Sequence, residues 1–143
     1  MHYRATFRET VRVAMMMSAE FSAFNQRSAW AQTIDASELP VFGVATPRET
    51  KVLDAQDVST RSTQLIVVLK RLGGDDLEDV LDFDSEAVER IVLTALLADP
   101  QRMASLSDTE VTIDGSGAQR VGTLQMTFRI EGWPLEPDYG AGD

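Results

Sequence analysis

The chain has 143 residues, 43% of which are hydrophobic, and its formal net charge is −10. This length and apolar content fit one domain with a buried core, and an acidic surface as a whole repels nucleic acid. Cysteine is absent and His2 is the only histidine, which excludes disulfides and argues against thiolate or imidazole catalysis and zinc sites. No apolar run approaches 18 residues, so we expect a cytosolic protein without a membrane span.

The first predicted element is a helix from Tyr3 to about Phe24, because apolar residues recur there at helical spacing. Arg4, Arg8 and Arg12 stand four residues apart and form a basic ridge on one flank of this helix, with Glu9 as a neighbouring counter-charge. The ridge is either a solvated helix face or a contact with an acidic partner, such as the acidic loop of a neighbouring copy.

Residues 25–38 are polar and mixed, which indicates a connecting segment anchored by Trp30. Residues 39–46 favour a short strand, with Pro40 at its first residue or at a sheet edge. Residues 46–49 are expected to break this strand, and residues 51–54 to form a further short strand.

The strongest strand signal runs from Gln64 to Leu72, where five apolar residues follow one another. Such a run predicts a central strand that is buried on both faces. A helix is predicted to follow and to end at Leu97, with Asp84 or Ser85 capping its first amides. This helix would lie on one face of the sheet.

An acidic connection from Gly73 to Asp84 separates that strand from that helix. A calcium loop that began at Asp75 would need a glycine at its sixth position, where Val80 stands, so the spacing argues against a metal site. We expect an exposed loop, which is either simply solvated or docks electrostatically on a neighbour through Asp75, Asp76 and Asp79.

The last third of the chain predicts a β-hairpin. Residues 101–107 are expected to form a connector that leads into the hairpin. Residues 109–113 are expected to form its first strand, and residues 114–117 its turn. The return strand alternates, with a bulge expected at Gly122. One face is apolar (Leu124, Met126, Phe128, Ile130), and the other would be wet or meet a partner (Thr123, Gln125, Thr127, Arg129).

These elements predict an α+β fold: a mixed, largely antiparallel sheet of about four or five strands, packed by the N-terminal helix and by a second helix after the central strand. We expect one domain over residues 1–132 and a flexible tail over 133–143. No catalytic constellation stands out in the sequence, so a non-enzymatic protein without a cofactor is expected.

Three stretches carry a family resemblance: residues 39–49 (LPVFGVATPRE), the long strand over 61–71, and the helix over 82–97. Together they resemble the tail terminator proteins of long-tailed phages, of the minor tail protein U type. The resemblance implies a hexameric ring in the tail-neck region of a virion that caps the tail tube and stops its polymerisation. Its partners would be the tail tube protein and a head-side connector, with DNA passing through the ring without specific binding.

Two other functions stay open at this point. One is a head-completion or neck adaptor protein, which would bind the portal side instead of the tube. The other is an enzyme that uses carboxylates and a divalent metal in residues 75–86. For an assembly protein, the candidate interface residues are the charged and polar sets named above: Arg4, Arg8, Arg12, Asp75, Asp76, Asp79, Thr123, Gln125, Thr127 and Arg129.

Overall fold

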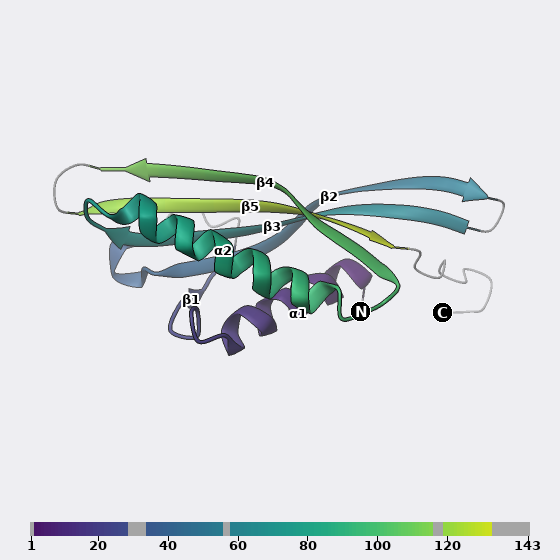
Figure 1. Ribbon diagram of the computed structural model, residues 1–143, viewed down its shortest axis with the longest axis horizontal. Helices are drawn as coiled ribbons and strands as arrows, with labels where there is room; N and C mark the ends of the chain where they lie inside the picture. The colour runs from purple at the N-terminus through teal and green to yellow at the C-terminus, as the bar shows by residue number, and fades with distance from the viewer. Residues whose placement is uncertain (1, 29–33, 56–57, 116–118, 133–143) are drawn as a thin grey trace.

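The computed structural model describes residues 2–28, 34–55, 58–115 and 119–132 (Figure 1). In chain order the elements are α1 (Tyr3–Met17), β1 (Asn25–Gln26), a 3₁₀ turn (Ala36–Glu38), β2 (Val41–Ala55), β3 (Val58–Gly73), α2 (Leu77–Leu96), β4 (Arg102–Asp114) and β5 (Arg120–Gly132). No helix in the part of the chain that the structure describes combines the length and apolar character needed to cross a bilayer.

The strands form one five-stranded sheet in the order β1-β2-β3-β5-β4. Within the part of the chain that the structure describes, β1 and β2 pair in parallel, and the β2–β3, β3–β5 and β4–β5 pairs are antiparallel. Both helices lie on the same side of the sheet (Figure 1). The predicted α+β class, the mixed and largely antiparallel sheet and the two packing helices are therefore confirmed.

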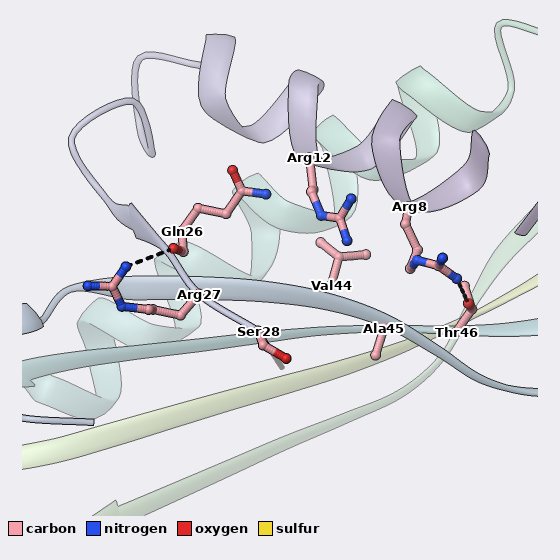
Figure 2. A pocket seen from close by; sticks show the side chains of 8 residues that line it. All are labelled: Arg8, Arg12, Gln26, Arg27, Ser28, Val44, Ala45 and Thr46. Atoms are coloured by element: carbon pink, nitrogen blue, oxygen red, sulfur yellow. Dashed lines mark hydrogen bonds between the residues drawn. The ribbon is translucent and has the colours of Figure 1, made fainter. Parts of the chain in front are cut away.

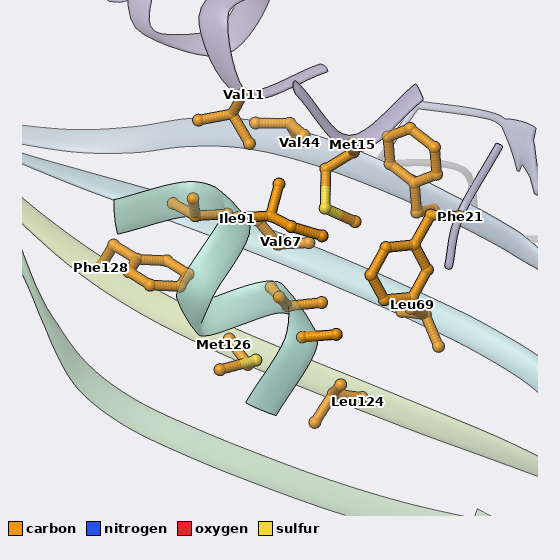
Figure 3. Packing of buried hydrophobic residues seen from close by; sticks show 14 of the residues in the cluster. Val11, Met15, Phe21, Val44, Val67, Leu69, Ile91, Leu124, Met126 and Phe128 are labelled. Carbon is orange, nitrogen blue, oxygen red and sulfur yellow. The ribbon is translucent and has the colours of Figure 1, made fainter. Parts of the chain in front are cut away.

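The core lies between the helices and one face of the sheet (Figure 3). On β3 this face carries Leu65, Val67 and Leu69, and on β5 it carries the predicted apolar set Leu124, Met126, Phe128 and Ile130. α1 contributes Val11 and Met15, and α2 contributes a longer apolar stripe. We call this the covered face.

The opposite face of the sheet corrects one prediction. β3 is central, between β2 and β5, but it is not buried on both faces. Ile66 and Val68 point away from the helices and are only half-buried. We call this side the open face, because no helix that the structure describes lies on it. The continuous apolar run was misleading, because half-buried apolar residues such as Ile66 and Val68 look the same in a sequence as fully buried ones.

β2 also differs from its prediction. The two short strands expected on either side of Pro47 are one strand of 15 residues. A register shift between Ala45 and Arg48 accommodates the proline as a bulge, where a missing N–H costs no ladder hydrogen bond. β2 therefore continues to pair with β3 beyond Pro47.

α1 is shorter than predicted, because it ends at Met17 and not near Phe24. The Ser18 hydroxyl donates to the carbonyl oxygen of Met15 at 2.6 Å, and its backbone turns to an extended conformation. The chain then turns back so that Phe21 is fully buried against the core.

α2 begins at Leu77, about eight residues before the predicted start, so most of the supposed acidic loop is helix. Leu77 and Leu81 in these first turns pack tightly over the sheet. A Cβ on Gly122 would lie 2.6 Å from Leu81 Cδ1 and 3.1 Å from Leu77. Gly122 is thus needed for close approach, and the bulge predicted there is wrong, because its pairing with Arg71 and Ile113 is regular.

The C-terminal hairpin is confirmed, with one correction. β4 begins at Arg102, so the expected connector over 101–107 is mostly strand. The bulge of this hairpin lies on β4, between Leu106 and Asp108. Residues 116–118, the predicted tail over 133–143 and the proposed anchor Trp30 lie outside the described residues.

Candidate partner interface

A basic cleft of about 790 Å³ lies where α1 passes over the start of β2. α1 supplies Arg8 and Arg12, and the segment around β1 supplies Gln26, Arg27 and Ser28. The floor is formed by Val44, Ala45 and Thr46 of β2. Figure 2 shows the guanidinium groups of Arg8 and Arg12 pointing from the helix toward this strand.

The three arginines of the cleft are held by different partners. Arg8 donates a hydrogen bond to Thr46 Oγ1. Arg12 lies 3.4 Å from Glu9, the counter-charge expected from the sequence, and Arg27 lies 3.0 Å from Glu38. Both ion pairs are partly exposed to solvent, so each contributes little to stability and can exchange partners. The cleft is therefore positive and accessible.

Two of the three arginines of the predicted basic ridge line the cleft. Arg8 and Arg12 share the cleft, whereas Arg4 does not line it and instead contacts the His2 ring nitrogen Nδ1 through its backbone N–H at 3.1 Å. Arg27 and Thr46, which complete the cleft, were missed by sequence reasoning. Their neighbourhood shows no strong periodicity, and only the fold brings β1 beside β2.

The acidic set lies at the other helix, in the first turn of α2. Asp76 is the residue before the helix, and Asp79 lies in its first turn. Asp75 is 99% exposed and has one distant partner, Arg120, at 3.8 Å. Negative charge here is favoured by the helix dipole, and the exposure that the sequence predicted for these three residues is confirmed.

Asp84 differs from the other acids of this region, because it is buried and pairs with Arg71 of β3. Nη2 of Arg71 donates to Asp84 Oδ1 at 2.9 Å, and Nε lies 2.8 Å from Oδ2. The predicted capping role of Asp84 is wrong. Burial raises the pKa of Asp84, while the charge of Arg71 and its hydrogen bond oppose this shift. Arg71 also stacks over the ring of Phe24.

The polar set of β5 lies on the open face, as its alternation predicted. Gln125 pairs with Val68 on one side and with Glu110 on the other, so polar residues surround a narrow apolar strip. Arg129 is exposed and donates to Ser62 Oγ at 3.0 Å. Thr127 is buried, so the wet or partner-facing position predicted for it is wrong. Exposure rises toward β4, whose side chains on this face are exposed: Ser105, Asp108, Glu110 and Thr112.

A ribbon projects beyond the sheet. β3 pairs with β5 only as far as Arg61, which lies opposite Gly132. β2 and β3 continue to pair with each other from Lys51 and Arg61 out to Ala55 and Val58. Figure 1 shows this ribbon extending past the end of β5. No third strand accompanies it within the described part of the chain.

Within residues 2–28, 34–55, 58–115 and 119–132, no three His, Asp or Glu side chains lie close enough together to hold a metal ion. No known protein family matches the sequence, and no characterised protein matches it. The surface of the described residues offers a basic cleft, an acidic helix end, an open face and a projecting ribbon.

Proposed function

We propose that this protein is a structural assembly protein that forms a closed homo-oligomeric ring, of the tail terminator kind. In this role the ring caps a finished tail tube, stops its polymerisation and presents a surface to a head-side connector. The count of six copies follows from the family resemblance alone, as does the identity of the tube.

The observation that carries the proposal is the two-stranded ribbon formed by residues 52–55 and 58–60. An isolated two-stranded hairpin is marginally stable at best in water, and unpaired strand edges tend to recruit further strands. A ribbon that leaves its own sheet is suited to pack on another subunit. A ring supplies such a neighbour for every copy.

The distribution of charge supports head-to-tail contacts. The basic cleft involves α1, β1 and β2, whereas the acidic residues Asp75, Asp76 and Asp79 lie at the start of α2. Two different and complementary surfaces on one chain favour heterologous contacts, which close into a ring when the rotation permits. Exposed charge contacts of this kind are weak singly, so assembly is expected to depend on concentration and on salt.

The test is to add the protein to polymerising tail tube protein and to measure tube lengths by electron microscopy. Wild-type protein is expected to shorten the tubes. A matched variant replaces residues 52–60 by Asn-Gly, which removes the ribbon but leaves every β3–β5 pair in place, and it is expected to lose this effect. Tubes that grow equally long with and without the wild-type protein would contradict the terminator function.

The neck adaptor remains the second candidate, because the same ribbon and charge distribution would serve a ring on the portal side. It predicts capture of portal protein with no effect on tube length, so the same preparation separates the two.

A further inference from the structure

The basic cleft concentrates positive charge on an acidic protein. Three arginines line it, no aspartate or glutamate is among the lining residues that the structure describes, and the whole chain has a formal net charge of −10. Glu9 and Glu38 approach from outside the lining, as partly exposed partners of Arg12 and Arg27. Ion pairs of this kind are weak, so both arginines can exchange these partners for another anion.

Arg8 and Arg12 form the centre of the cleft. They are four residues apart on α1, so both side chains leave the same flank of the helix, and Figure 2 shows both guanidinium groups pointing toward β2. Arg8 donates to Thr46 Oγ1, and no described carboxylate pairs with Arg8. This bond holds Arg8 in place before a ligand arrives, which lowers the entropic cost of binding. The Thr46 oxygen is the acceptor, so the hydroxyl hydrogen of Thr46 can be donated to a ligand.

These donors fit a multivalent oxyanion better than a single carboxylate. Each guanidinium presents a planar fork of N–H donors that matches the oxygens of a phosphate group. A carboxylate has one charge and two oxygens, and would leave part of both forks unused. Arg27 lies at the other end of the cleft from Arg8 (Figure 2), and the cleft volume is about 790 Å³. Positive charge and space therefore extend beyond what one phosphate needs.

We propose that the basic cleft is a binding site for a multivalent phosphate-type oxyanion, such as a pyrophosphate group, with Arg8 and Arg12 as its ligating residues. The site is built from one chain, so the inference goes beyond the proposed assembly into a ring and does not depend on it. A bound anion neutralises positive charge that the head-to-tail contact would otherwise use.

The first test is titration of the full chain with pyrophosphate at low salt, followed by isothermal titration calorimetry. Wild-type protein is expected to bind pyrophosphate at least fivefold more tightly than orthophosphate. Arg8→Gln and Arg12→Gln are each expected to weaken pyrophosphate binding at least tenfold, because each removes one donor fork. Arg4→Gln is the matched control, since Arg4 belongs to the same ridge but does not line the cleft. Absence of binding, or equal weakening by the Arg4 variant, would overturn the proposal.

The second test looks for a gain of affinity, which a misfolded variant cannot mimic. Glu9→Gln removes the carboxylate that lies 3.4 Å from Arg12, and it is expected to tighten pyrophosphate binding roughly twofold to fivefold. Glu86→Gln removes the same charge from the exposed surface of α2, away from the cleft lining, and is expected to leave binding unchanged. Equal tightening by both variants would show an effect of overall charge, and would overturn the site.

The same titration distinguishes two other occupants. A single-stranded oligonucleotide is expected to bind more weakly than pyrophosphate, because the acidic protein repels a long polyanion. Tighter binding of the oligonucleotide would overturn the assignment to a compact anion. Asp75→Asn with Asp76→Asn is expected to change pyrophosphate binding no more than Glu86→Gln does. A larger gain would show that acids of a neighbouring copy fill the cleft, and would also overturn the proposal. None of these measurements uses tail tubes, so failure here is separate from failure of the terminator function.

Discussion

The two faces of the sheet differ although they are built from the same strands. On β3, Leu65, Val67 and Leu69 are almost completely buried under the helices, while their neighbours Ile66 and Val68 are half-buried on the open face. The covered face contributes most of the hydrophobic stabilisation. On the open face, Ile66 and Val68 stay partly exposed in the monomer and lie among polar residues. Among the described residues, the core is therefore built on one side of the sheet.

The largest expected effect comes from exchanging one residue on each face. Val67→Asp would place a charge in the closed core and is expected to cost more than about 4 kcal/mol of unfolding free energy, giving insoluble protein. Val68→Asp, one residue further on, faces the open side and is expected to cost roughly 1 to 2 kcal/mol. Urea unfolding and soluble yield measure both. Equal losses would mean that the open face is as dry as the core.

The next effect concerns the buried ion pair at the rim of the covered face. Arg71→Met is expected to cost about 3 kcal/mol, because it leaves the Asp84 carboxylate buried without its partner. The double variant Arg71→Met, Asp84→Leu removes both charges and is expected to recover most of this loss in urea unfolding. A double variant as unstable as the single one would show that lost packing, and not the unpaired charge, causes the loss of stability.

A smaller effect tests the close approach of α2 to β5. Gly122→Ala is expected to cost about 1 to 3 kcal/mol, because the new methyl group would lie 2.6 Å from Leu81 Cδ1. Gly132→Ala is the control on the same strand, since its nearest neighbour is 3.6 Å away, and it is expected to change the melting temperature little. If both variants melt like the wild type, the helix is free to move away from the sheet.

The smallest effect is a pH dependence. Because burial raises the pKa of Asp84 above its ordinary value of 3.8, folding favours the protonated acid. That contribution is complete below pH 3.8 and is lost as pH rises through the raised pKa of the folded state. The wild type should therefore lose stability relative to Asp84→Asn over this interval and then run parallel to it. A gain of the wild type over the variant with rising pH would mean that Arg71 dominates and the pKa is lowered.

The sequence predicted those helices and strands that bury one side and expose the other. The alternation of β5 and the stripe of α2 are visible because each has one buried side, and both were confirmed. Three features could not be read in this way. A proline bulge keeps β2 continuous through Pro47, acidic residues occupy the first turns of α2, and Asp84 is buried by a partner 13 residues away.

The candidate site was predictable only in part for a similar reason. Arg8 and Arg12 were found because helical spacing groups residues that are close in sequence. Arg27 joins them only because the short strand β1 pairs with β2, and no local pattern marks that pairing. The length of the projecting ribbon was equally hidden, because it depends on where β5 ends relative to β3.

We have proposed that the ribbon and the uncovered surfaces join copies of this chain into a closed ring. The most direct measurement is the native mass by analytical ultracentrifugation over a concentration series, for the wild type and for the variant in which Asn-Gly replaces residues 52–60. We predict a single discrete oligomer for the wild type, of six copies, and a monomer with nearly unchanged urea unfolding for the variant. A wild-type monomer at every concentration, or a variant that assembles equally well, would contradict the account.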